Sequence, residues 1–258
     1  MKSTYILRKT VKMNDSLIHW CNALYQLCCD FDEQKHSCCF EDEFDVFTDY
    51  PRLYYAVYEK KILGFLSTYI IDANSVEFCL FVHPKFRNRQ IGTMLLREFL
   101  KDYNMKNMEV SVAPDNRTGI QFLEKNSFYF ASTELLMGTQ LKSFMSRGCA
   151  KLNMQKDSLS NSFKYMIDSE CAGLCNISFL SDTHICISDM EIFKKYRNHG
   201  LGFQFLSGIL QEMSQYFDYA ILHVTKENLP AYKLYKKLGF EELDKTVIYT
   251  FHKKRDNG

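Results

Sequence analysis

The chain has 258 residues, of which 46% are hydrophobic and 24% charged, and its formal net charge at pH 7 is +1. This composition is typical of a globular protein and argues against a largely disordered chain. The balance of 32 basic against 31 acidic side chains argues against binding to nucleic acid or to an anionic membrane by bulk charge.

The sequence predicts neither a membrane span nor a secretory signal. It contains no run of about 20 apolar residues, and the basic residues near its start are not followed by an apolar stretch. Ten cysteines without such a signal favour reduced thiols, so we expect a cytoplasmic protein. Cys28-Cys29 and Cys38-Cys39 lie near His36, but adjacent thiols lack the spacing of zinc ligands, and we predict no metal site.

The predicted elements of the first half begin with a helical segment at about 14–29. β-rich runs separated by turn residues follow it at 54–58, 65–71 and 76–82. Apolar residues then recur at helical spacing after Gly92, and the half continues with a strand at 108–112, a short helix at about 117–125 and a closing strand to about 141.

The second half repeats this order after a serine-containing linker near 142–161. Strands are predicted at 163–167, 174–179 and 184–192, and a helix is predicted after Gly202. A strand at 220–224, a helix at about 229–237 and a closing strand to about 252 follow. This order predicts an α/β (α+β) fold.

Two blocks of sequence occur twice. Residues 82–100 read VHPKFRNRQIGTMLLREFL and residues 192–210 read IFKKYRNHGLGFQFLSGIL, which aligns Arg87 with Arg197 at an offset of 110. In the second block Asn116 aligns with Asn228 at an offset of 112. Because solenoid repeats are only about 20–50 residues long, we interpret this pattern as two tandem domains, residues 1–141 and 142–258.

The segment from Arg197 to Gly202 has the chemistry of an anion site. It lies between a predicted strand and a predicted helix, and its glycines let the backbone approach a ligand closely. The start of the following helix offers unpaired amides and a positive dipole end, and Arg197 can add charge-assisted hydrogen bonds. Such a loop suits a diphosphate, although a tight turn alone would also explain the glycines.

The two blocks together resemble the GCN5-related N-acetyltransferase (GNAT) family. Arg197 through Gly202 match the family's acetyl-CoA loop, Q/R-x-x-G-x-G/A. The later family pattern, N-x-x-A-x-x-x-Y-x-x-x-G-F, is matched by five residues of this chain: Asn228, Ala231, Tyr235, Gly239 and Phe240. The resemblance implies a mixed, twisted sheet flanked by helices in each half, and a sheet that splays open to admit the pantetheine arm of acetyl-CoA.

The resemblance also implies acetyl transfer from acetyl-CoA to an amine in the C-terminal half. Glu191 would be the general base and Tyr235 the general acid. The residues implied to bind acetyl-CoA are Ile192, Arg197, Asn198, His199, Gly200, Leu201, Gly202, Phe203 and Asn228.

Each implied role has a simpler alternative. Glu191 could be an exposed carboxylate at a strand end, and Asp189 is a competing base because it shares that face in a regular strand. Tyr235 lies on the apolar side of its helix and could belong to the core. His199 fits a side chain in solvent, and Cys186 fits a core position.

The first half lacks the corresponding chemistry. Phe81, Gln90, Leu123 and Ser127 stand where the second half has Glu191, Gly200, Tyr235 and Gly239. We therefore predict a degenerate domain and one tight CoA site per chain, although Arg87 and Gly92 leave weak binding open.

An acidic region between Asp30 and Asp49 could attract a cationic amine or could simply be solvated surface. The expected acceptor is a small-molecule or peptide amine, and a homodimer stays open. The alternative function is a non-catalytic CoA-binding or partner-binding protein made of two degenerate domains.

Overall fold

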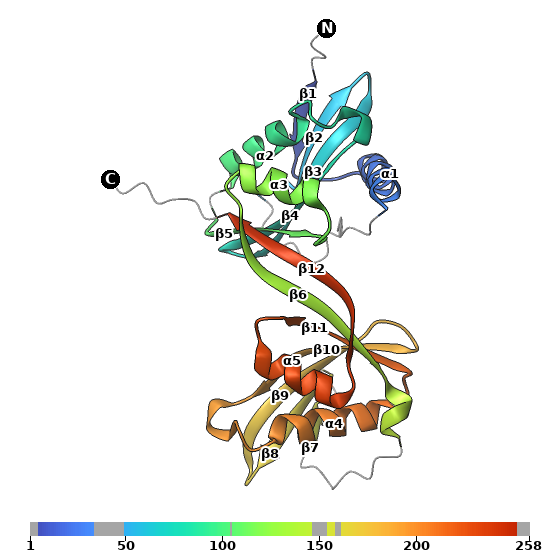
Figure 1. Ribbon diagram of the computed structural model, residues 1–258, viewed down its shortest axis with the longest axis vertical. Coiled ribbons are helices and arrows are strands. Elements are labelled where there is room, and N and C mark those ends of the chain that lie inside the picture. Colours follow the sequence, from blue (N-terminus) through green and yellow to red (C-terminus); the bar gives the residue numbers. More distant parts are fainter. Residues whose placement is uncertain (1–4, 34–48, 104, 146–153, 158–160, 252–258) are drawn as a thin grey trace, which may run out of the picture. The chain divides into compact units, whose positions relative to one another are not determined.

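The computed structural model describes residues 5–33, 49–103, 105–145, 154–157 and 161–251. The chain forms two compact units. The first contains Met1–Ala131 with Thr246–Gly258, and the second contains Ser132–Lys245. Each unit is a mixed sheet flanked by helices (Figure 1), as the sequence predicts.

The sheet of the first unit has the strand order β1-β2-β3-β4-β5-β12. Its strands are β1 (Ile6–Thr10), β2 (Leu53–Tyr58), β3 (Lys61–Asp72), β4 (Ser75–Val82), β5 (Asn107–Val112) and the end of β12 (Glu241–Phe251). Only β4 and β5 among these described pairs run parallel.

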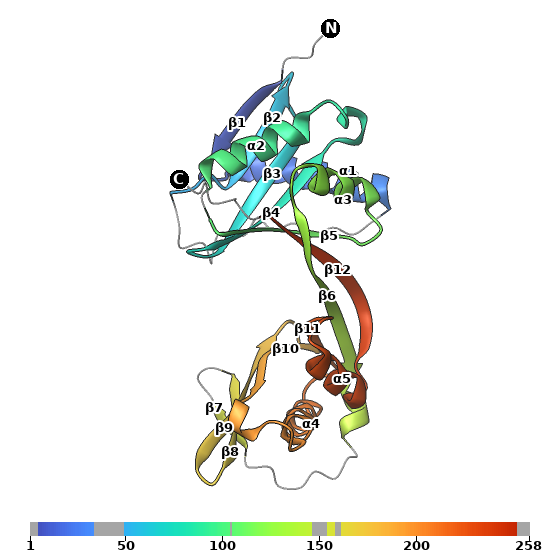
Figure 2. The ribbon, with the colours of Figure 1, turned by 60° about the vertical axis from the view of Figure 1, so that its left-hand side comes forward.

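Helices cover both faces of this sheet. Helix α1 (Asp15–Asp32) lies behind β2 and β3 in Figure 2, and α2 (Ile91–Asp102) lies in front of them. Phe65 of β3 packs with α1, while its neighbour Leu66 packs with α2. Because both faces are covered, β3 carries a continuous buried run rather than an alternating pattern. Helix α3 (Arg117–Lys125) follows β5.

The second unit repeats this plan, but its described residues include no α-helix before its parallel strands. Its strand order is β6-β11-β10-β9-β8-β7. The strands are β6 (Tyr129–Gln140), β7 (Met154–Asp157), β8 (Ser162–Ile167), β9 (Glu170–Phe179), β10 (His184–Ile192) and β11 (Tyr219–Thr225), and the helices are α4 (Leu201–Met213) and α5 (Leu229–Leu238). Short 3-10 turns occur at Pro84–Phe86, Leu141–Phe144 and Lys194–Tyr196.

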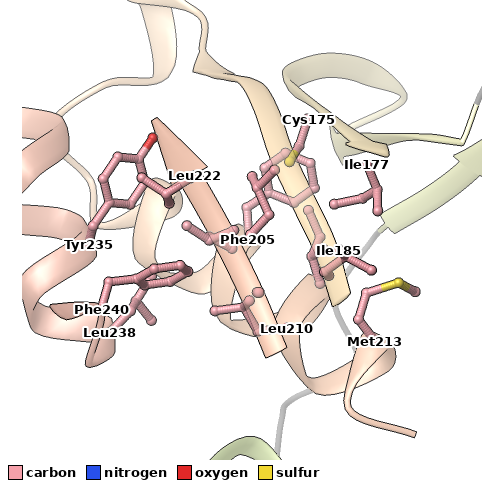
Figure 3. Packing of buried hydrophobic residues seen from close by; sticks show 14 of the residues in the cluster. Cys175, Ile177, Ile185, Phe205, Leu210, Met213, Leu222, Tyr235, Leu238 and Phe240 are labelled. Atoms are coloured by element: carbon pink, nitrogen blue, oxygen red, sulfur yellow. The ribbon is translucent and has the colours of Figure 1, made fainter. Parts of the chain in front are cut away.

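The core of the second unit lies between its sheet and helices α4 and α5 (Figure 3). Phe205, Leu206 and Leu210 of α4 are fully buried there against Ile185 and Ile187 of β10. In β9 buried residues alternate with more exposed ones, because the apolar residues face only one helical layer.

The boundary between the two units differs from the predicted domain boundary between residues 141 and 142. The closing strand of the first half, β6, pairs with β11 through Glu134–Gln140 and belongs mainly to the second unit. The end of the closing strand of the second half, Val247–Phe251, pairs with β5 in the first unit. Periodicity predicts a strand but not its partner, so this exchange was not visible in the sequence.

None of the described helices is long and apolar enough to cross a membrane. Within the described residues, no group of three or more histidine, cysteine, aspartate or glutamate side chains is arranged to hold a metal ion. Cys28 is buried and Cys29 is half-buried on α1, whereas Cys38, Cys39 and His36 lie outside the described residues.

Gly173 of β9 allows the closest approach of β10. A Cβ atom there would lie 2.6 Å from the carbonyl oxygen of Glu191 and 2.7 Å from the Cδ1 atom of Ile192. Gly173→Ala should therefore lower the free energy of unfolding by about 1–3 kcal/mol, as overpacking does. Scanning calorimetry would measure the change.

The control is Gly202→Ala in α4, where a Cβ atom would make only ordinary contacts, the nearest at 3.5 Å. That variant should unfold at or above the wild-type temperature, because alanine favours helix over glycine. An equal loss of stability in both variants would contradict the close-approach explanation.

Candidate active site

Strands β10 and β11 hydrogen-bond over only part of their length. Their parallel ladder joins His184–Ile187 to Tyr219–Leu222, although β10 continues to Ile192 and β11 to Thr225. A β-bulge between Ser188 and Glu191 shifts the register of β10 against β9 at the same level. The bulge inserts one extra residue and re-aims the side chains around it.

The loop after β10 presents backbone amides at the start of α4. Asn198 and Gly200 have positive φ angles of 68° and 74°, and α4 begins at Leu201 without a side-chain cap. A Cβ atom on Gly200 would meet nothing within 4 Å, so the space beside this glycine is open. Uncapped amides with the positive end of the helix dipole form an anion site.

Arg197 is bound to the end of β10. Its Nε atom donates to the carbonyl oxygen of Ile192 at 2.7 Å, and its Nη2 atom donates to Oε1 of Glu191 at 2.9 Å. The side chains of Arg197 and Glu191 are 52% and 53% exposed. The structure thus brings together a residue predicted to bind acetyl-CoA and the residue predicted to be the base.

The two candidate carboxylates of β10 have different surroundings. Glu191 lies opposite Leu174 of β9 in the register. Asp189 sits in the bulge with a φ angle of 49°, and its Oδ2 atom accepts a hydrogen bond from Nδ2 of Asn176 at 2.8 Å. Because of the bulge, the regular alternation that we expected between Asp189 and Glu191 does not apply here. Both residues are exposed.

Tyr235 of α5 is buried, with 7% of its surface exposed. Its ring packs against that of Phe240, and Figure 3 shows its hydroxyl directed away from Phe240 and Leu238. Burial raises the pKa of the Tyr235 phenol to about 12, with a smaller contribution from Cys175. The side chain therefore belongs to the core, as the simpler alternative held, and also keeps its proton at neutral pH.

Asn228 begins α5. Its side-chain oxygen accepts a hydrogen bond from the amide of Ala231 at 3.3 Å, and Asn116 caps α3 in the same way through Gly119 at 2.9 Å. The structure thus gives Asn228 a capping role that the sequence reading had not included.

The other predicted positions lie along the same loop and helix start. His199 is exposed, as expected for a side chain in solvent, and Leu201 and Gly202 are partly buried. Phe203 is partly buried beneath the ammonium group of Lys237, which lies 4.7 Å from the ring centre. Cys186 is half-buried on β10, and burial raises its pKa.

The first unit keeps the loop conformation despite its different residues. Asn88 and Gln90 have φ angles of 61° and 65°, close to those of Asn198 and Gly200. Ser127 likewise adopts a φ of 65° where Gly239 has 92°. A non-glycine residue in this conformation costs about 1–2 kcal/mol, so the absence of glycine here did not remove the turn.

A cavity of about 430 Å³ lies beside this loop in the first unit. Strands β4 and β5 pair only through Ser75–Glu77 and Asn107–Glu109, and the cavity is lined by the parts beyond. It is also lined by the loop, the start of α2 and one face of α3. At its edge Arg87 donates to both carboxylate oxygens of Asp32, at 2.6 and 2.8 Å.

Comparison with protein families gives one description for both halves. A model described as "Acetyltransferase (GNAT) family" matches residues 20–128 and 140–240. The chain belongs to the GNAT family. Members of this family generally use acetyl-CoA as co-substrate, and membership supports an acetyltransferase function.

Solved structures of other GNAT proteins share the fold over nearly the whole chain. A GCN5-related N-acetyltransferase from Sphaerobacter thermophilus has a TM-score of 0.72 and 11% identity, covering 96% of this chain and 95% of that one. A tandem GNAT protein from the clavulanic acid biosynthesis pathway has a TM-score of 0.64 and 14% identity, with 96% and 98% covered. A search of curated proteins finds no match.

Sequence reasoning missed three residues, two that contact β10 in the second unit and one that contacts the loop of the first unit. These are Gly173, Asn176 and, in the first unit, Asp32 as the partner of Arg87. A glycine inside a strand is a signal of close backbone approach. Gly64 and Gly173 directly precede the strands predicted at 65–71 and 174–179, but the structure places them inside β3 and β9, opposite Val82 and Ile192. Nothing in the sequence pairs Asp32 with a residue 55 positions away.

Removing the Asn228 cap should destabilise the protein. Asn228→Ala leaves the amide of Ala231 without its acceptor and should lower the free energy of unfolding by about 0.5–2 kcal/mol. Asn228→Asp keeps an acceptor oxygen and should restore most of this loss. Urea denaturation followed by circular dichroism measures both values, and equal stability of Asn228→Ala and wild type would contradict the capping role.

Proposed function

We propose that this protein transfers an acetyl group from acetyl-CoA to a small-molecule or peptide amine, with its reacting centre in the second unit. The observation that carries the proposal is the parting of β10 from β11 beside an open glycine loop and the uncapped start of α4. The diphosphate would bind the amides there, and the pantetheine arm would extend back along β10.

Glu191 is the proposed general base. It is exposed at the end of β10, where an amine can reach it from solvent directly or through a water molecule. Taking a proton from the ammonium form of the acceptor frees the nitrogen lone pair for attack. The competing base is Asp189, which lies two residues earlier on the same strand.

Tyr235 is the proposed general acid. The nitrogen attacks the thioester carbonyl, a C–N bond forms and the C–S bond breaks, and the nitrogen passes its second proton to solvent water. The leaving thiolate takes a proton from the Tyr235 hydroxyl, and the Tyr235 phenolate regains a proton from solvent. Burial raises the pKa of this phenol to about 12, so the group is protonated at neutral pH and holds the proton that the thiolate takes.

Replacing either group should slow acetyl transfer. Glu191→Gln and Tyr235→Phe should each lower kcat by about 10²–10⁴-fold, because each removes one proton-transfer group. The measurement is thiol release from acetyl-CoA with a panel of amines. Since the Tyr235 pKa is raised from 10 to about 12, the wild-type profile should show no basic limb from this group below about pH 11.

Two variants nearby serve as matched controls. Tyr232→Phe removes another hydroxyl of α5, which binds Glu242, and Glu170→Gln removes another exposed carboxylate, which binds Lys195. Both should keep wild-type rates. Wild-type rates in Glu191→Gln or Tyr235→Phe on a genuine substrate would refute their roles, and CoA binding without transfer to any amine would favour the non-catalytic alternative.

A second candidate function is acyl-CoA binding by the first unit. The cavity favours it, because the cavity lies where β4 and β5 part and touches the start of α2. Binding by one unit alone gives one CoA site per chain, whichever unit it is, and binding by both units gives two.

Acidic substitutions at matching helix positions distinguish CoA binding by the first unit from CoA binding by the second unit. Thr93 and Phe203 are each the third residue of their helix, α2 and α4. A glutamate there suits the helix dipole but repels a diphosphate. By calorimetry, Phe203→Glu should weaken the tight CoA site at least tenfold and abolish transfer, whereas Thr93→Glu should leave both intact. The reverse result would place the donor in the first unit.

A further inference from the structure

We propose that Arg197 is a positioning residue for Glu191 and is not the ligand of the CoA diphosphate. This inference rests on the proposed function, because it assigns a role to Glu191 as the base. It changes the role that the family resemblance implied for Arg197.

The guanidinium group of Arg197 is held at two points on β10. The Nε atom donates to the Ile192 carbonyl at 2.7 Å, and the Nη2 atom donates to one oxygen of the Glu191 carboxylate at 2.9 Å. A planar guanidinium that makes both bonds has its orientation fixed. It therefore holds Oε1 of Glu191 and leaves Oε2 to face an incoming amine.

Arg87, the matching arginine of the first unit, also binds back to its preceding strand. This orientation is therefore a common feature of the loop in both units. Arg87 also donates from Nε to the carbonyl oxygen of the residue five positions earlier, Val82, at 3.2 Å. Its other nitrogens again bind a carboxylate, that of Asp32. In both units the arginine thus fastens its loop to the preceding strand and binds one carboxylate.

The carboxylate that binds the arginine comes from a different element in each unit, because the residue at the strand position of Glu191 differs. Phe81 stands at the position of Glu191 and is buried beneath α1 with Phe65 and Tyr25. In the first unit α1 supplies Asp32 to the arginine instead. The second unit supplies the carboxylate from β10 itself, beside the strand parting.

The diphosphate has another set of partners in the second unit. Helix α4 begins without a side-chain cap, and its first turn is closed by the bond from the Gln204 amide to the Gly200 carbonyl. The amides of Leu201, Gly202 and Phe203 precede that bond, and the first amides of a helix have no partner within the helix and can bind an anion. Donor binding therefore does not need Arg197 to leave Glu191.

The test separates kcat from KM. Arg197→Gln should lower kcat about tenfold to a hundredfold, because misplacing a reacting group by about 1 Å costs that much, and should change the KM for acetyl-CoA less than threefold. Arg197→Lys keeps the charge but cannot make both hydrogen bonds, so it should not restore kcat. Lys195→Gln removes a cation two residues away that binds Glu170, and should retain wild-type kcat and KM.

A double-mutant cycle with Glu191→Gln tests whether Arg197 acts through Glu191. Arg197→Gln should cost little further in the Glu191→Gln background, because the group that it positions is already absent. An unchanged kcat with a KM raised tenfold or more, or the same loss of kcat in both backgrounds, would overturn the inference.

A measurement of CoA affinity tests the role of Arg197 in donor binding without requiring acetyl transfer. Calorimetric titration of Arg197→Gln with CoA should give an affinity within threefold of wild type, and a weakening of tenfold or more would overturn the inference. If wild type transfers no acetyl group to any amine, the proposed function fails on that result. Thermal unfolding of each variant confirms folding, since an exposed ion pair contributes only about 0–1 kcal/mol.

Discussion

A short parallel ladder determines the architecture around each candidate site. In the second unit β10 and β11 pair over four residues and then separate, and in the first unit β4 and β5 pair over three. Both strands of each pair continue beyond the ladder, so backbone amides and carbonyls line the space between them. Buried backbone groups need partners, and a ligand that carries its own amides can supply them.

The helix that follows each loop starts where the strands have already separated. Gly200 and Gln90 take the left-handed conformation at the same place, which turns the chain from strand into helix without a side-chain cap. A diphosphate bound there would be held by the backbone. The amino-acid sequence of the loop can therefore change while its anion-binding geometry remains.

The two units differ most on the face that carries Glu191. In the first unit α1 covers this face, and the residues beneath it are apolar, including Phe65 and Phe81. In the second unit β7 ends at Asp157 and β8 begins at Ser162, and no described α-helix lies between them. A charged residue is then tolerated at Glu191, because its carboxylate stays in water and beside Arg197.

Much of this organisation could be predicted from the sequence, because helices, strands and the duplication leave periodic and aligned signals. Strand β10 and helix α3 were predicted with the boundaries that the structure has, and α1 within a few residues. The exceptions depend on tertiary structure. Gln90 and Ser127 adopt conformations usually reserved for glycine, and the bulge at Asp189 has no sequence signal. The exchange of closing strands depends on pairing between segments far apart in the chain.

The exchanged strands also set the order in which the protein can be completed during synthesis. A ribosome that has made the first 131 residues has synthesised nearly all of the first unit, but the strand that pairs with β5, Val247–Phe251, follows only after the whole second unit. The edge of β5 that pairs with β12 therefore has no partner strand while the second unit is translated. An exposed strand edge can pair with other chains, so the nascent protein is prone to association until Val247–Phe251 emerges and pairs with β5.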